Sequence, residues 1–117
     1  LLVYYPLASG ALSGKYRGGQ MPKNARMTLF KGWERMINPL AMKAWEEYYK
    51  LAKENNITMT QLAQAFVNSR PFVTSNIIGA TNLDQLNENI KTFDLELSKD
   101  LLEKIDKIHD ECPFPCP

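Results

Sequence analysis

Residues 4–16 read Tyr4-Tyr5-Pro6-Leu7-Ala8-Ser9-Gly10-Ala11-Leu12-Ser13-Gly14-Lys15-Tyr16, and this stretch decides how the chain folds and what it can bind. The apolar run at residues 1–5 predicts a short buried strand, which Pro6 ends because proline has no N–H to donate to a sheet. Beyond it, small residues let the backbone approach a phosphate closely, and Lys15 offers a positive charge. Because open sheets and barrels bind ligands where their strands end, the stretch predicts an anion-binding loop.

The loop differs from the P-loop of nucleoside-triphosphate hydrolases. Gly10 and Gly14 enclose three residues where that motif needs four, and Tyr16 follows Lys15 where it needs Ser or Thr. An ATPase or a GTPase is therefore disfavoured. Chemistry alone leaves a second interpretation open, in which the loop is a glycine-rich surface connection and Lys15 is solvated.

A second candidate segment follows a second predicted strand, at residues 73–78, which Gly79 ends. Asn82 is expected to cap the next helix, and the free N–H groups of a helix N-terminus attract phosphate, to which Thr81 adds a hydroxyl. Three polar residues on one face of that helix could hydrogen-bond an adenine ring: Gln85, Glu88 and Asn89. The alternative is a capped, solvated helix in which Gln85 is the capping-box partner of Asn82.

Four helices are expected from their caps and their apolar periodicity. The expected N-caps are Asn38, Thr58, Asn82 and Ser98. The first helix has Pro39 at its first position and runs to about Glu54, and the second has Gln61 completing a capping box and stops at Arg70-Pro71. The side chains expected to face inward are Ala41, Ala44, Trp45, Tyr48 and Ala52, then Leu62, Ala65, Phe66 and Ser69, then Leu83, Leu86, Ile90 and Phe93, and finally Leu101, Ile105 and Ile108.

The expected order is strand, long loop, two helices, strand, two helices, which indicates a parallel α/β arrangement. No helical period persists over residues 6–38, and a segment of that length without regular structure is usually functional. Two strands cannot shield both faces of a sheet, so further strands are expected upstream of Leu1. The abrupt apolar start also indicates a chain cut from something larger.

Composition excludes several classes of function. With 44% hydrophobic residues, 23% charged residues and a net charge of +1, the chain lacks the dominant charge of a nucleic-acid or anionic-membrane binder. No apolar run approaches the roughly 20 residues of a membrane span, and no signal peptide is evident, so a cytoplasmic location is expected. Cys112 and Cys116 are the only cysteines, too few for a structural zinc site, and no metal is expected. His109 has no predicted catalytic partner.

Two motifs resemble one protein family. The first loop closely resembles the segment after strand seven of the aldo-keto reductases, above all in the branch that contains the potassium-channel β subunits and the Tas-like oxidoreductases. Residues 77–90 resemble the segment after strand eight. The resemblance covers essentially the whole chain. It implies the C-terminal part of a (β/α)8 TIM barrel, with strands seven and eight, their helices and the C-terminal helix, as one incomplete domain over residues 1–117.

The resemblance also implies a cofactor, NADPH or NADP+, and the residues that contact it. Tyr4 matches the aromatic residue that packs on the nicotinamide ring, the loop closes over the pyrophosphate, and Arg26 reaches the adenosine phosphate end. Tyr5 departs from the family pattern, since many relatives have serine there. The implied cofactor-binding residues are Tyr4, Tyr5, Pro6, Leu7, Ala8, Ser9, Gly10, Lys15 and Arg26 from the first segment, and Gly79, Thr81, Gln85, Glu88 and Asn89 from the second.

The implied activity is NADPH-dependent reduction of aldehydes or ketones. The family's catalytic Asp, Tyr, Lys and His precede strand five and therefore precede Leu1, so no catalytic residue is assigned here and this chain alone is expected to be inactive. Two alternatives remain, a regulatory subunit of the channel-β type that binds NADP(H), and a small α/β interaction domain that binds no cofactor. Besides a small carbonyl substrate, the expected partners are the missing N-terminal part or a second copy of the chain.

Overall fold

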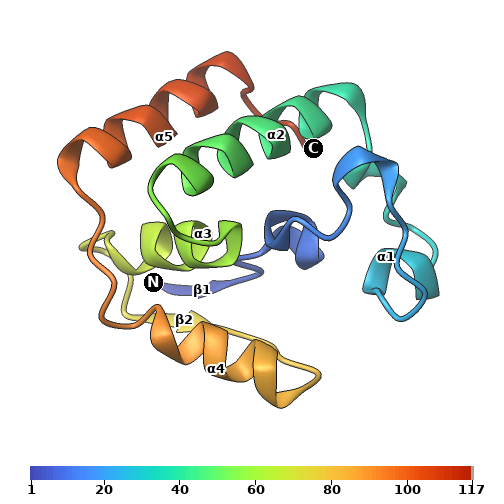
Figure 1. The fold of residues 1–117 in the computed structure, drawn as a ribbon, viewed down its shortest axis with the longest axis horizontal. Coiled ribbons are helices and arrows are strands. Elements are labelled where there is room, and N and C mark those ends of the chain that lie inside the picture. The colour runs from blue at the N-terminus through green and yellow to red at the C-terminus, as the bar shows by residue number, and fades with distance from the viewer. Residues whose placement is uncertain (117) are drawn as a thin grey trace.

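The computed structural model describes residues 1–116, without the side chain of residue 34. Two short strands, β1 (Leu2–Tyr4) and β2 (Ser75–Ile77), pair in parallel, with Leu2 opposite Ser75 and Tyr4 opposite Ile77. Four longer helices follow the predicted order: α2 (Pro39–Glu54), α3 (Met59–Asn68), α4 (Leu83–Lys91) and α5 (Lys99–Glu111). Figure 1 shows α2 and α5 together on one side of α3, and the strands and α4 on its other side.

The four predicted helix caps are confirmed. The side chains of Asn38, Thr58, Asn82 and Ser98 each accept a hydrogen bond from the backbone N–H three residues later. At Thr58 the capping box is complete, because the Gln61 side chain accepts from the Thr58 N–H in return. Each cap satisfies a donor that has no partner inside its helix, so local sequence alone fixes where these helices begin.

The long loop over residues 6–38 contains short helical turns that the absence of a persistent period did not reveal. They are η1 (Ala8–Ser13), η2 (Arg17–Gly19), α1 (Arg26–Leu29) and η3 (Glu34–Met36). Tyr16 is buried, and its hydroxyl accepts a hydrogen bond of 3.1 Å from the Met27 backbone N–H, which ties α1 to the residue that precedes η2. This bond determines where neighbouring Arg26 lies.

Two apolar clusters form the core. One joins the loop to the first half of α2, and the other joins the second half of α2 to α3 and α5. Their buried members are Ala11, Tyr16, Ala25, Met27, Met36, Ala41, Trp45 and Met59 in the first, and Leu51, Ala52, Leu62, Leu101 and Ile105 in the second. The long loop therefore contributes to the core, and α2 connects it to the rest of the molecule.

The predicted burial is wrong for α4 and for both strands, since Ile77 on β2 is 51% exposed. Ser69, which was expected to face inward, is also exposed. The four side chains expected to face inward from α4 are exposed: Leu83, Leu86, Ile90 and Phe93, the last of them 81% exposed. The helix instead turns Asn89 inward, because that side chain hydrogen-bonds with Gln64 of α3. Leu2 and Tyr4 on β1 are also exposed. Among the described residues, no element packs over these two apolar surfaces.

No helix within residues 1–116 has the combination of length and apolar character that crossing a bilayer requires.

The side-chain amide of Asn38 makes hydrogen bonds to three segments of the chain. Its Oδ1 accepts from the Ala41 N–H at 2.9 Å, while Nδ2 donates to the carbonyl oxygens of Arg35 at 2.9 Å and Pro115 at 2.7 Å. The end of the long loop, the start of α2 and the C-terminal tail therefore meet at one side chain.

We expect Asn38→Ala in the complete protein to lower the free energy of unfolding by about 1–2 kcal/mol, because a helix cap and two further hydrogen bonds are lost. Asn38→Ser retains a capping oxygen and should recover part of that loss, leaving a deficit that measures the amide donation to the two carbonyls. Urea unfolding followed by circular dichroism tests this. Equal losses in the two variants would contradict the capping role.

Candidate functional site

Both predicted binding segments leave the same edge of the sheet. Tyr4 and Ile77 end β1 and β2 and lie opposite each other in the parallel pair. The chain therefore enters the first loop at Tyr5 and the second turn at Ile78 from neighbouring positions, and Figure 1 shows both connections leaving toward the right. Strand ends of this kind carry the ligand sites of parallel α/β proteins.

The first loop begins with a strained backbone. Tyr5, Ala8 and Ser9 have φ values of 61°, 46° and 59°, and they are three of the five non-glycine residues with positive φ in the described chain. The left-handed region costs an L-residue roughly 1–2 kcal/mol. The conformation is held by hydrogen bonds from the Ala8 N–H to the Tyr5 carbonyl and from the Gly10 N–H to the Leu7 carbonyl, at 2.9 and 2.8 Å. Such strain clusters at binding sites.

Lys15 folds back across Gly10. A Cβ at Gly10 would lie 2.8 Å from the Lys15 Cε and 3.1 Å from its Nζ, so the end of the Lys15 side chain would have to shift, and the φ of 95° at Gly10 is a conformation that favours glycine. Within residues 1–116, no salt bridge is formed by the Lys15 ammonium, whose nearest aromatic ring is that of Tyr16, 5.8 Å away. A cation close to exposed backbone and free of a carboxylate suits an anionic group.

A series of ring contacts links Arg26 to the end of β1. The ring centroids of Tyr4 and Tyr5 are 5.1 Å apart, those of Tyr5 and Trp33 are 6.4 Å apart, and the Arg26 guanidinium carbon lies 6.0 Å from the Trp33 ring. The structure thus brings three predicted site residues together. Trp33 was missed in the sequence, where its only signal is an aromatic residue directly after a glycine in the long loop.

A bidentate ion pair docks the same loop onto α2. Arg17 donates from Nε to Oε1 of Glu46 at 3.0 Å and from Nη2 to Oε2 at 2.7 Å, and its guanidinium carbon lies 3.2 Å from the centroid of the Tyr49 ring. The hydrogen bonds from Arg17 hold the pKa of the Glu46 carboxyl below its ordinary value, although burial acts in the opposite direction. A bidentate pair fixes orientation as well as distance.

In the second segment, the hydrogen bonds differ from the predicted capping box. Asn82 accepts from the Gln85 N–H at 2.9 Å as expected, but the Gln85 side chain does not return to Asn82. Its Oε1 instead accepts from the Thr81 N–H at 2.9 Å and from the Thr81 hydroxyl at 3.1 Å. The reason is that Thr81 carries two donors within reach, so Gln85 fixes the residue that the sequence selected as a phosphate contact.

Glu88 and Asn89 share the predicted face of α4, and that face lies against α3. The Thr58 hydroxyl donates to Glu88 Oε1 at 2.6 Å. Gln64, which is 1% exposed, donates from Nε2 to Asn89 Oδ1 at 3.2 Å and accepts from Asn76 Nδ2 at 2.7 Å. The amide of Asn89 then donates to the Gly79 carbonyl at 3.3 Å.

These side chains form a buried polar network that links β2, α3 and α4 to the turn at Gly79. The two segments meet where Tyr4 pairs with Ile77 in the sheet, and α3 contacts both η1 and α4 and so also connects them. The network positions the second segment through Glu88 and Asn89, while Gln85 bonds separately to Thr81.

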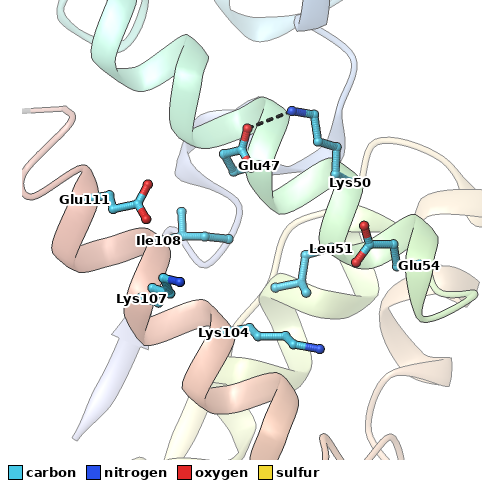
Figure 2. Close-up of a pocket in the computed structure, with 8 residues that line it drawn as sticks. All are labelled: Glu47, Lys50, Leu51, Glu54, Lys104, Lys107, Ile108 and Glu111. Atoms are coloured by element: carbon cyan, nitrogen blue, oxygen red, sulfur yellow. Dashed lines mark hydrogen bonds and ion pairs between the residues drawn. The ribbon is translucent and has the colours of Figure 1, made fainter.

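Two further hollows lie outside the strand ends. A groove of about 240 Å³ lies between α2 and α5. Figure 2 shows the residues that line it, in which side chains of both charges lie around Leu51 and Ile108. Lys50 is paired with Glu47 at 2.8 Å in that groove, and balanced charge of this kind is typical of a solvated helix surface. Among the described residues, no group of three His, Cys, Asp or Glu side chains could hold a metal ion.

The other hollow is an apolar groove of about 450 Å³ beside β1. It is lined by side chains of β1, α2, α3 and α5, among them Val3, Leu62 and Ile105. Tyr48 also lines it, and burial raises the pKa of the Tyr48 hydroxyl above its ordinary value. Together with the exposed surfaces of β1 and α4, this groove leaves much apolar area uncovered within residues 1–116.

The fold and the loop geometry define a parallel α/β protein with a candidate anion site at its strand ends. Residues 1–110 match the model of the Aldo/keto reductase family. Protein tas from Escherichia coli (strain K12) is 41% identical over 117 residues, which are 100% of this chain and 34% of that protein. The chain belongs to the aldo/keto reductase family.

Two other relatives differ in their described roles. A probable voltage-gated potassium channel subunit beta from Arabidopsis thaliana is 34% identical over 97% of this chain and 36% of its own length. The L-glyceraldehyde 3-phosphate reductase of Escherichia coli O157:H7 is 29% identical over 91% of this chain and 32% of its own length. The chain thus spans about a third of the length of the curated relatives that it matches.

We expect Gln64→Leu to lower the free energy of unfolding by about 1–3 kcal/mol, because Asn76 loses an acceptor and Asn89 loses a donor at a buried position. The exposed residue Gln20 provides a matched control, and Gln20→Leu should change stability by less than about 0.5 kcal/mol. Urea unfolding of the complete protein makes the comparison. If Gln64→Leu is as stable as Gln20→Leu, the network does not stabilise this part of the fold.

The Arg17–Glu46 pair predicts a pH effect. Because the pKa of Glu46 is lower in the folded state, the stabilisation is fully present above the unfolded carboxyl pKa of about 4.3 and is lost as the pH falls through the lower folded value. Stability should therefore fall less steeply below about pH 4.3 in Glu46→Gln and in Arg17→Met than in the wild type. Solvent screening limits the difference to about 1 kcal/mol. Identical pH profiles of unfolding would contradict it.

Proposed function

We propose that residues 1–117 form the C-terminal part of a (β/α)8 barrel, in which β1 and β2 occupy the places of strands seven and eight. The parallel pairing of the two strands supports this placement, as do the family match over residues 1–110 and the share of about a third of each relative. The exposed apolar surfaces of β1 and α4 then receive the neighbouring strands and helices of the barrel. The partner of these surfaces is accordingly the N-terminal part of the barrel, and a second copy of the chain competes for them when that part is absent.

At the strand ends, the chain binds NADP(H). The observation that carries this proposal is the free ammonium of Lys15 held across Gly10, in a strained loop that leaves the carboxyl end of β1. Lys15 and the loop backbone hold the pyrophosphate, and Arg26 meets the adenosine 2′-phosphate. Tyr4, which is 69% exposed at the end of β1, is free to pack on the nicotinamide ring.

The second segment holds the adenosine end. Gly79 allows close approach of the backbone, and Thr81 is held by Gln85 next to the first turn of α4, where free N–H groups favour a phosphate. Glu88 and Asn89 lie on the same helix face as Gln85, and they recognise the adenine by exchanging the bonds that they now make with α3. The pyrophosphate is lined by residues of the first segment, which are Tyr5, Pro6, Leu7, Ala8 and Ser9.

The complete protein reduces an aldehyde or a ketone. NADPH supplies the hydride in that reaction, and the residues of this chain bind and orient the cofactor. No side chain here is assigned as the proton donor, so residues 1–117 alone are inactive. The family membership of the chain supports a reductase, as does a relative that is named for reducing L-glyceraldehyde 3-phosphate.

A second candidate function is that of a regulatory subunit that binds NADP(H) as a sensor. The similarity to a probable potassium channel subunit beta favours it, with 34% identity over 97% of the chain. The cofactor site is the same in both proposals, and carbonyl reduction by the complete protein distinguishes them. The remaining interpretation, an interaction domain without a cofactor, predicts no nucleotide binding.

We expect Arg26→Met to raise the Kd for NADPH about tenfold or more and to change the Kd for NADH less than about twofold, because only NADPH carries the 2′-phosphate. Lys23→Met, which removes another exposed cation from the same loop, should leave both constants unchanged. Titration calorimetry of the complete protein measures the constants. Equal and weak binding of both cofactors by the wild type would contradict the proposed cofactor site.

A further inference from the structure

Trp33 lies at the far end of the long loop from Tyr5, and their rings are neighbours. The two ring centroids are 6.4 Å apart with an interplanar angle of 51°, a tilted geometry that aromatic pairs favour. On its other side, the Trp33 ring lies 6.0 Å from the guanidinium carbon of Arg26. The Trp33 ring therefore lies between Tyr5, at the start of the loop, and the guanidinium of Arg26.

The ring of Trp33 packs against the hydrophobic core. Trp33 is half-buried and packs against the apolar cluster that includes Tyr16 and Met27. Gly32 precedes it with a φ of 95°, a conformation that an L-residue adopts only with strain. The indole is therefore held in place by its packing against this cluster.

Tyr5 is the more exposed partner of this pair. It leaves β1 with a φ of 61°, so its ring does not follow the alternation of the strand, and it is 52% exposed. Its ring contacts are those with Tyr4 at 5.1 Å and with Trp33. A bulky side chain in a strained conformation at the surface needs compensating contacts, and these two rings supply them.

We infer that Trp33 is a positioning residue of the cofactor site, which closes residues 5–33 into one unit and holds Arg26 toward a phosphate. The inference rests on the proposed function, because Arg26 is the group that Trp33 positions. Without the indole, the Arg26 side chain gains rotational freedom and the two ends of the loop separate. Loss of the indole therefore weakens the binding of NADPH, which carries the 2′-phosphate, more than the binding of NADH, which lacks it.

The test uses the complete protein with Trp33→Leu and with Phe30→Leu, which removes an exposed aromatic ring from the same loop as a matched control. We expect Trp33→Leu to raise the Kd for NADPH about three- to tenfold, with a change below about twofold for NADH. If Trp33 had only a structural role, its loss would raise the Kd for NADPH and the Kd for NADH by the same factor. Phe30→Leu should change neither constant.

A second measurement needs no cofactor. Trypsin cleavage at Lys23 and Lys31 in the free protein should be several times faster in Trp33→Leu, because the loop opens more often. Tyr5→Ser removes the other ring of the pair at an exposed position. This variant can be used in the same test if Trp33→Leu does not fold. It should also speed cleavage, and adding it to Trp33→Leu should have little further effect, because both changes break the same contact.

The outcomes separate the two levels of the proposal. If the wild type binds neither cofactor, the proposed function fails and this inference fails with it. When the wild type discriminates between the cofactors, an equal loss of both in Trp33→Leu, or cleavage at the wild-type rate in both Trp33→Leu and Tyr5→Ser, overturns the role of Trp33 alone.

Discussion

The parallel pairing of β1 with β2 is the constraint on which the rest of the chain depends. Parallel strands cannot be joined by a tight turn, so a long connection has to return from the end of one to the start of the other. Here that connection contains the folded loop, α2 and α3. The pairing also makes Tyr4 and Ile77 neighbours, and both candidate binding segments therefore begin at the same edge.

Two kinds of interaction hold these segments, and they differ in chemistry. The first segment is held by apolar burial around Tyr16 and Met27, by the Arg17–Glu46 pair and by ring contacts that meet at Trp33. The second is held by amide hydrogen bonds through Gln64. The bidentate ion pair of the first segment and the amide network of the second each fix direction as well as distance.

Sequence patterns predicted the caps and the elements because those signals are local. Thr58 and Gln61 lie one helical turn apart, so their capping box can be recognised without knowledge of the fold. The orientation of α4 could not be predicted in the same way. Periodicity shows that Leu83 and Ile90 share a face with the other apolar side chains, but which face is covered depends on the neighbouring elements. Trp33 was missed for a related reason, since its contacts with Tyr5 and Arg26 exist only after the loop has folded.

The bond between Asn38 and Pro115 has a consequence for biosynthesis. The two residues lie 77 positions apart, and the amide of Asn38 cannot complete its bonds until Pro115 has left the ribosome. The junction between the long loop and α2 is thus completed late, after α3 and α5 have been translated. Until the tail has been made, one donor of the Asn38 amide therefore lacks its partner in the folded chain.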